Sequence, residues 1–568
     1  MIRSCFARVA VVVLCIGLGL PTAAQTPRTP AISQDDLRTW LTYLSSDELQ
    51  GRQAYTEGLG LASAYIARHL QEWGVKPGGD RGSYFQEVRV LGIRTRSNSS
   101  VTVTVNGQTR TFKDGEGVTF PRNQGAKQTM NGEAAFVGYG VTFAPLQVDD
   151  YARGNVAGKV AIFLGRTGPK GFTNAHNRIL GARGRMATDT QRAVASITQA
   201  ATTPQAPPPT GPPAQRVDFQ TAQRLDSPID PQITASDDFF NFVFSTSGAD
   251  YATLKAAAEK QEPLPDVTLS GVSIAITVDA TYDIIQTRLT RNVVGLIEGS
   301  DSALKDSYVL LGAHYDHIGY EQFVVNQRLN AIASCTGQSR PAPRPGDVIN
   351  NGADDDGSGT VLLMALAKAF SRGARMKRSL LLVWHTAEEG GLSGSRYMAD
   401  HAVVPLEKVS AHLNIDMVGR NKCDDPKEAD TVYVVGSDRI STELHNLNED
   451  ANAALPKPLT LDYELNDPTD LESIYTRSDH FSYATKGVPI IFFTTGLHRD
   501  YHFVTDEVDK IVFPKIARIA GLVYGTAARV ANLDHQPVRD NLGPRVGKGQ
   551  TGRLEGQQGQ RANGKGQR

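Results

Sequence analysis

Apolar and polar residues alternate in a regular way through the second half of the chain. Short, almost wholly apolar runs have the length of buried strands, and the stretches between them repeat apolar residues at helical spacing. Strands that alternate with amphipathic helices predict an α/β fold with a mainly parallel sheet flanked by helices. The predicted strands are residues 308–313, 379–385, 411–415 and 489–495, and the clearest helices are residues 360–370 and 513–531.

Between about residues 91 and 284 the pattern changes to short runs of alternating polar and apolar residues. Val101-Thr-Val-Thr-Val105 is typical of a half-buried strand. The proline-rich stretch 202–215 is expected to be an exposed loop, because proline lacks a backbone donor. No group of His, Cys, Asp and Glu with metal-ligand spacing occurs in this segment. We therefore predict a strand-rich insert without catalytic residues, within an α/β domain formed by residues 25–90 and 285–535.

The N-terminus is typical of a secretory signal peptide. Arg3 and Arg8 precede an apolar run at residues 9–20, and the small residues Thr22-Ala-Ala24 follow it. The apolar run is too short for a typical membrane span. The sequence therefore predicts a signal peptide at residues 1–24, cleavage near Ala24, a secreted or periplasmic protein, and no membrane span.

Composition narrows the range of partners. The formal net charge of −1 argues against a nucleic-acid partner. Residues 536–568 are rich in Gly, Gln, Lys and Arg, and are expected to be a disordered basic tail. After removal of the signal peptide, Cys335 and Cys423 remain, and the sequence leaves open whether they pair or stay free thiols.

Several segments of the α/β region carry a candidate metal ligand at the end of an apolar run or in a tight turn. Ligands of open α/β sheets bind outside the carboxyl ends of the strands, so we expect these side chains to converge. Imidazole and carboxylate groups suit zinc, and the adjacent carboxylates of Asp354-Asp-Asp356 repel one another unless a cation lies between them. Each residue alone has a common structural role, such as helix capping, and only their coincidence favours a metal centre. The candidates are His314, Asp316, Asp355, Glu388, Glu389, Asp416 and His502.

These motifs resemble those of the dinuclear zinc aminopeptidases of peptidase family M28. The resemblance covers about residues 292–519 and the leading helices, and implies a zinc-exopeptidase fold of the phosphorylase/hydrolase-like type. Phe136-Val-Gly-Tyr-Gly140 and Val156-Ala-Gly-Lys-Val160 in the insert are similar to a protease-associated (PA) domain. The M28-like motifs are Gly312-Ala-His-Tyr-Asp316, Gly352-Ala-Asp-Asp-Asp-Gly-Ser-Gly359, Ala387-Glu-Glu-Gly-Gly-Leu-Ser-Gly-Ser395, Asn414-Ile-Asp-Met-Val-Gly419, Ser478-Asp-His480 and Tyr501-His502.

The resemblance implies two zinc ions per chain that share the carboxylate of Asp355. His314 and Asp416 would bind one ion, and Glu389 and His502 the other. The resemblance also implies a cis peptide bond after Asp355.

Glu388 corresponds to the general base of the family, and Tyr501 is expected to stabilise the oxyanion. Asp316 is expected to accept a hydrogen bond from the His314 imidazole. Four further histidines are not ligands in the family, and of these His385 is expected in the core. The four are His317, His385, His480 and His498.

The predicted activity is hydrolysis of the first peptide bond of peptides that have a free N-terminus. Three alternatives stay open: a carboxypeptidase, a glutaminyl-cyclase-like enzyme with one zinc, and a non-enzymatic binding homologue. The long segment 320–348, which holds Cys335, is expected to form a rim over the cleft.

Overall fold

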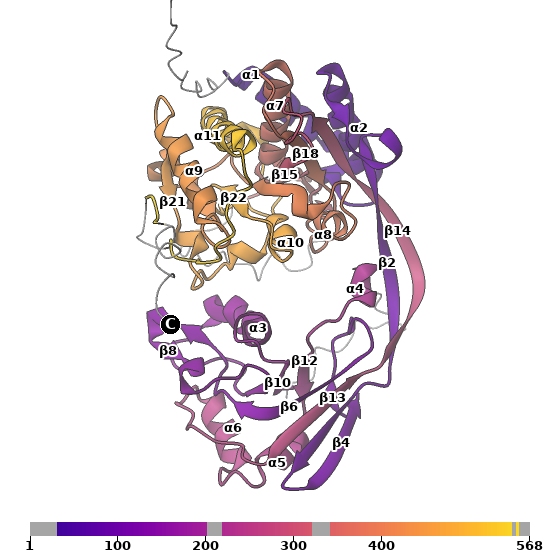
Figure 1. Cartoon of the computed structure of the whole chain (residues 1–568), viewed down its shortest axis with the longest axis vertical. Helices are drawn as coiled ribbons and strands as arrows, with labels where there is room; N and C mark the ends of the chain where they lie inside the picture. Colours follow the sequence, from indigo (N-terminus) through magenta and orange to yellow (C-terminus); the bar gives the residue numbers. More distant parts are fainter. Residues whose placement is uncertain (1–30, 201–217, 321–334, 336–340, 548–551, 556–568) are drawn as a thin grey trace, which may run out of the picture.

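The structure is a computed structural model that describes residues 31–200, 218–320, 335, 341–547 and 552–555. The predicted signal peptide and the proline-rich loop 202–215 lie outside the described residues, so export stays a prediction. The described chain contains a mixed sheet of ten strands, an eight-stranded closed barrel and two short two-stranded sheets (Figure 1). Within the described ranges, none of the helices has the length and hydropathy that crossing a bilayer requires.

The large sheet has a parallel centre and antiparallel neighbours. Its order is β11-β2-β14-β18-β15-β19-β22-β20-β21, and β1 pairs with β14. Strands β18, β15, β19 and β22 run parallel, but β14 is antiparallel to β18, and β20 to β22. The strands are β1 (Lys76–Pro77), β2 (Phe85–Ser97), β11 (Asp218–Thr221), β14 (Ala280–Ile297), β15 (Tyr308–His314), β18 (Ser379–His385), β19 (Val409–Ile415), β20 (Thr431–Val435), β21 (Thr460–Asp462) and β22 (Ile490–Thr494).

The α/β class is therefore confirmed, but the sheet is mixed rather than mainly parallel: besides its parallel centre, β20 pairs parallel with β21, and the other pairs are antiparallel. The physical reason is the long pair of β2 and β14. These strands come from the two ends of the insert and pair antiparallel with each other, which needs no crossover helix.

Helices cover both faces of the parallel centre, which explains why its strands are apolar throughout. Leu311 packs with α1, α2, α7 and α11 on one face, whereas Leu310 packs with residues of α8 and α10 on the other. The helices of the large sheet are α1 (Gln34–Leu44), α2 (Glu57–Glu72), α7 (Gly359–Arg372), α8 (Ser393–Asp400), α9 (Thr442–Ala453), α10 (His480–Ala484) and α11 (Phe513–Asn532).

The barrel belongs to the insert and has its own apolar core, which includes residues of α5 and α6. Strands β2 and β14 form a long antiparallel ribbon that runs from the large sheet to the barrel (Figure 1). The likeness of the insert to a PA domain stays a prediction. The barrel strands are β3 (Ser100–Val105), β4 (Gln108–Asp114), β5 (Gly117–Thr119), β6 (Gln128–Phe136), β9 (Val160–Phe163), β10 (Ala195–Gln199), β12 (Gln232–Ala235) and β13 (Val272–Val278). The remaining elements are α3 (Asn177–Arg185), α4 (Gln223–Asp226), α5 (Asp237–Phe244), α6 (Tyr251–Glu259), β7 (Thr142–Phe143), β8 (Val148–Asp149), β16 (Gly319–Tyr320) and β17 (Ile349–Asn350).

The first part of the predicted disordered tail is packed against the α/β domain. Val546 is buried, and its backbone N–H donates to Asp438 Oδ2 over 2.7 Å. Farther along, the carbonyl of Leu554 accepts from Asn446 Nδ2 on α9 over 2.7 Å. The prediction of disorder is therefore wrong for residues 536–547 and 552–555. Much of their attachment uses backbone groups, which leave no mark in the composition.

Lys515 on α11 is a buried cation. Its Nζ donates to Asn421 Oδ1 over 2.8 Å and to the carbonyl of Glu428 over 2.7 Å. Burial lowers the pKa of Lys515 to about 8. Between pH 8 and about 10.5, the unfolded chain then binds more protons than the folded chain, so this lysine makes the folded state more stable as pH rises.

We compare the free energy of unfolding of the wild type with that of Lys515→Met. The difference between the two is expected to rise in favour of the wild type by up to about 3 kcal/mol between pH 8 and 10.5, and to be independent of pH below pH 8. Urea unfolding of both proteins at pH 7, 8, 9 and 10 measures this difference, and groups that titrate alike in both cancel. A difference that does not change with pH would contradict the expectation.

Candidate metal centre

The five predicted ligands meet at one edge of the sheet, where its parallel strands end. His314 is the last residue of β15, Asp416 follows β19 directly, and Glu389 lies in the turn after β18. Asp355 lies in the acidic turn before α7, and His502 lies in the loop after β22. Parallel strands present their carboxyl ends together, which is why residues so far apart in sequence come close in space.

Asp355 lies between two groups of donor atoms. His314 Nε2 is 3.2 Å from Asp355 Oδ1 and 3.6 Å from Asp416 Oδ1. On the other side, His502 Nε2 is 3.0 Å from Asp355 Oδ2 and 3.0 Å from Glu389 Oε2. One carboxylate therefore offers one oxygen to each group, the arrangement that a pair of cations requires.

His317 is a candidate that the sequence analysis set aside. Its Nδ1 lies 2.8 Å from Glu389 Oε1 and 3.8 Å from Asp355 Oδ2. The ring is buried, and apart from the approach to Glu389 neither of its nitrogens has a hydrogen-bond partner within the described part of the chain. The sequence feature that could have identified His317 as a ligand is its position three residues after His314, just beyond the end of a buried strand.

Gly352 makes room for the His317 ring. Its φ is +55°, and a Cβ at this position would lie 2.5 Å from the Cγ and Cδ2 atoms of His317. Any other residue would therefore displace the imidazole as well as strain the turn.

The donor atoms suit divalent metal ions. Two groups within the described residues have donor atoms that all lie within 4.8 Å of one another: His314, Asp355 and Asp416, and His317, Asp355 and Glu389. Burial alone would raise the pKa of Asp355, yet hydrogen bonds with His314 and His502 hold it well below its usual range. Buried imidazoles and carboxylates of this kind are the donors that zinc prefers, so these residues fit two zinc ions.

A second layer of hydrogen bonds orients the donors. Asp416 Oδ2 accepts from Ser478 Oγ over 2.6 Å, and Asp506 Oδ2 accepts from the backbone N–H of Asp355 over 3.1 Å. The Asp355–Asp356 peptide bond is cis, as the resemblance implies. Such contacts fix where each ligand oxygen points.

The expected role of Asp316 needs correction. The His314 Nδ1 atom lies 3.1 Å from the backbone carbonyl of Asp316, whereas the Asp316 carboxylate is 3.7 Å away. That carboxylate accepts from the backbone N–H of Glu388 instead, over 3.0 Å. Asp316 therefore positions both residues, one through its backbone and the other through its side chain.

The other histidines named above lie outside the two donor groups. His385 Nε2 is 2.8 Å from the Tyr483 hydroxyl, and His480 Nε2 is 2.8 Å from the carbonyl of Tyr475. His498 Nε2 is 3.2 Å from Asp354 Oδ2. All three are buried, and their contacts are those of structural residues.

Glu388 and Tyr501 both line two hollows beside the donor groups. Burial, reinforced by the neighbouring Glu389, raises the pKa of Glu388 well above its usual range. The Tyr501 hydroxyl accepts from Arg477 Nη2 over 3.1 Å, and the Tyr501 ring stacks on that of His502. The smaller hollow has an apolar wall, and the larger one, a cleft of about 620 Å³, reaches the insert. The apolar wall consists of Met417, Ile474, Phe492 and Leu497.

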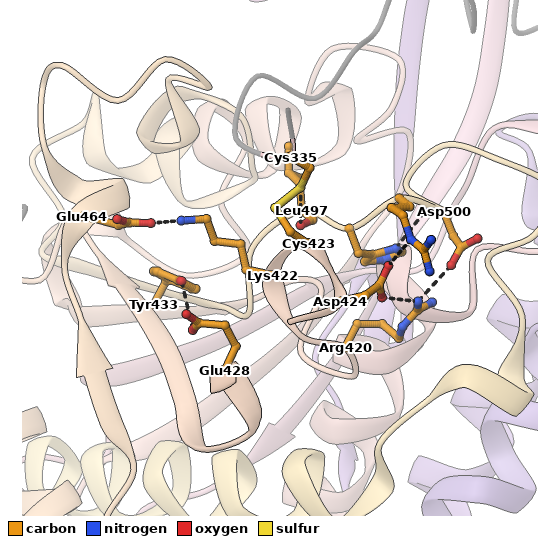
Figure 2. The surroundings of a disulfide bond; sticks show 12 residues. Cys335, Arg420, Lys422, Cys423, Asp424, Glu428, Tyr433, Glu464, Leu497 and Asp500 are labelled. Carbon is orange, nitrogen blue, oxygen red and sulfur yellow. Dashed lines mark hydrogen bonds and ion pairs between the residues drawn. A yellow bond between two sulfur atoms is a disulfide. The ribbon is translucent and has the colours of Figure 1, made fainter. Parts of the chain in front are cut away.

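The two cysteines form a disulfide bond close to this site (Figure 2). Their Cα atoms are 5.3 Å apart, which answers the question that the sequence left open. The backbone N–H of Cys423 donates to the carbonyl of Leu497 over 2.8 Å, and Leu497 lines both hollows. The bond therefore fixes Cys335 next to the wall of the site. Most of the predicted rim, residues 320–348, lies outside the described residues.

Residues 292–527 match the family model described as "Peptidase family M28". Leucine aminopeptidase 2 of Arthroderma otae is 24% identical over 307 residues, which cover 50% of this chain and 53% of that protein. A probable leucine aminopeptidase of Trichophyton verrucosum is 26% identical over 249 residues, which cover 42% and 56%. The chain thus spans about half the length of the curated relatives it matches.

A comparison with solved structures finds an aminopeptidase from Aneurinibacillus sp. strain AM-1, with a TM-score of 0.43 and 18% identity over 92% of this chain and 98% of that one. Another is BSAP, a zinc aminopeptidase from Bacillus subtilis, with a TM-score of 0.41 and 16% identity over 91% and 100%. The segment matched by the family model contains the parallel centre of the sheet and every candidate ligand.

Proposed function

We propose, because residues 292–527 match the model of peptidase family M28, that the protein is an exported aminopeptidase that uses two zinc ions to hydrolyse the N-terminal bond of peptides. The observation that carries the proposal is the position of Asp355, with one carboxylate oxygen in each of two donor groups. Glu388 lines the cleft beside both groups, where a base is required.

His314 and Asp416 would hold one ion, Glu389 and His502 the other, and Asp355 both. When bound, zinc ions lower the pKa of a water molecule and polarise the carbonyl of the substrate. The buried side chains exclude bulk water from the donor atoms, which strengthens every charge interaction there.

Glu388 takes the proton from the attacking water and later delivers it to the amine that leaves. Arg477 donates to the oxygen of the Tyr501 hydroxyl, so the proton of that hydroxyl stays free to stabilise the oxyanion that develops on the substrate.

The apolar hollow would receive the side chain of the N-terminal residue. Met417, Ile474, Phe492 and Leu497 form its apolar wall, while the charged groups that line it are those of the metal site and Arg477, so an apolar residue such as leucine is expected against that wall. Hydrolysis of leucine p-nitroanilide, with its N-acetylated form as the control, tests the activity. Equal cleavage of both compounds would contradict an aminopeptidase, and cyclisation of N-terminal glutamine without hydrolysis would support the cyclase alternative.

His317 would add a third side chain, besides Asp355, to the ion held by Glu389 and His502. We expect His317→Ala to lower the affinity of one of the two zinc sites. The loss should exceed the roughly tenfold to hundredfold loss that is typical when a residue contacting a ligand, rather than the metal itself, is replaced. Zinc content after dialysis against graded chelator, measured by mass spectrometry, should fall from two ions per chain to one at low chelator concentration.

The exposed His535 supplies the control for this experiment, since its replacement by alanine should leave zinc content unchanged. Retention of both ions by His317→Ala with the affinity of the wild type would exclude His317 as a ligand.

A further inference from the structure

The large cleft beside the proposed zinc site has one wall from each part of the chain. Asn177 and Arg178 at the start of α3 line it from the insert, opposite Glu388 and His502. Figure 1 shows α3 on the side of the insert that faces α8 and α10. A peptide whose first bond lies at the zinc ions would therefore extend its remaining residues toward the insert.

Three arginines and three glutamates line this cleft, and two of the glutamates, Glu388 and Glu389, lie at the metal end. Arg178 Nε lies 3.5 Å from Glu472 Oε2, and Arg477 Nη1 lies 3.2 Å from the same oxygen. The two guanidinium groups thus share the carboxylate of Glu472 at close range, while Asp470 acts on Arg178 from farther away.

The third arginine, Arg396 on α8, lines the same cleft and is partly buried. Within the described part of the chain, its guanidinium has no carboxylate at ion-pair distance and makes no hydrogen bond. Burial, together with the nearby Arg224 and Arg185, lowers the pKa of Arg396 to about 10. The acidic groups that act on it from farther away are Asp400 and Glu388. A partly desolvated cation among like charges is the signature of a site for an anion that arrives with the ligand.

We propose that Arg396 and Arg178 bind a carboxylate group of the substrate on the leaving side of the scissile bond. This inference rests on the proposed function and deepens it. The planar guanidinium forms two parallel hydrogen bonds with a carboxylate, so it recognises that group better than a point charge does. The carboxylate has two sources, the main-chain terminus of a dipeptide or tripeptide, or an acidic side chain in a longer peptide.

The ratio of kcat/KM for Leu-Gly to that for Leu-Gly-amide tests the first source. The ratio of kcat/KM for Leu-Glu-amide to that for Leu-Gln-amide tests the second source. A hydrogen-bonded charge pair of this kind is expected to give the wild type a preference of about tenfold to hundredfold for the carboxylate in at least one comparison. Arg396→Gln and Arg178→Gln should each reduce that ratio toward one. The ratio for Arg396→Lys should lie between that of the glutamine variants and that of the wild type.

Each ratio compares two substrates on the same protein, so a general loss of activity or folded protein cancels. Arg122→Gln, an exposed change in the insert away from the cleft, is the matched control and should keep the ratio of the wild type. Ratios near one for the wild type in both comparisons, or ratios unchanged in both glutamine variants, would overturn the inference.

Calorimetry on the Glu388→Gln protein separates this inference from the proposed function. If leucine p-nitroanilide is not hydrolysed by the zinc-loaded wild type, the proposed function fails, and binding still decides the present question. Tighter binding of a carboxylate peptide than of its amide partner, lost in Glu388→Gln/Arg396→Gln, supports the site. Equal binding of both members of each pair overturns it.

Discussion

Replacement of Glu388 by glutamine is expected to lower the kcat of the zinc-loaded protein by about a hundredfold to ten-thousandfold, the usual contribution of a general acid-base residue. Glutamine has nearly the same shape but cannot accept a proton from water. Glu388 is not in either donor group, so zinc content should stay at the level of the wild type. Steady-state hydrolysis of leucine p-nitroanilide, with zinc measured on the same sample, checks both statements.

A matched control for this change is Glu259→Gln, an exposed glutamate at the end of α6 in the insert. It should leave both kcat and zinc content unchanged. If Glu388→Gln turns over substrate at nearly the rate of the wild type, the assignment of the base is wrong. If it loses zinc, Glu388 is a ligand instead.

Asp355→Asn is expected to abolish both zinc binding and activity, with a larger loss of activity than Glu388→Gln. The change removes the one negative charge that faces both donor groups, so two cations close together would repel each other without a shared anion. The neighbouring His314 and His502 would also lose the carboxylate that they share.

Thermal unfolding provides the measurement that does not depend on turnover. Chelator should lower the Tm of the wild type, because bound metal stabilises the folded state, and should leave the Tm of Asp355→Asn unchanged. Asp509→Asn, an exposed change in the same domain, should respond to chelator as the wild type does. Two zinc ions held by Asp355→Asn at the affinity of the wild type would refute the bridging role.

That the candidate ligands lie close together in space was predictable from the sequence, because the carboxyl ends of parallel strands meet at one edge of a sheet. A buried parallel strand shows as an apolar run, and a polar residue at its carboxyl end, such as His314 or Asp416, then has a known position in space. No structure was needed to expect these side chains near one another. Their roles as ligands remain for the zinc measurements to decide.

Features that depend on distant pairing were not predictable in this way. The direction of β14 relative to β18 is set by its partner β2, more than 180 residues earlier in sequence, and no local pattern records it. His317 was set aside because it has no counterpart among the family's ligands, although its burial against Glu389 is apparent in the structure. Arg178 was missed because it lies in the segment with the fewest candidate groups.

The ribbon of β2 and β14 links the two parts of the chain whose residues line the cleft. Arg178 on α3 lies in the insert and Arg396 on α8 in the α/β domain, and the two strands stay paired from Ser97 and Ala280 to Phe85 and Val293. The pairing register shifts once, between Ile284 and Gln286, where a bulge interrupts the ladder. The ion pair of Arg178 with Glu472 and the packing of Leu471 against the barrel core join the two walls a second time, so the ribbon and these contacts together hold the walls of the cleft in place.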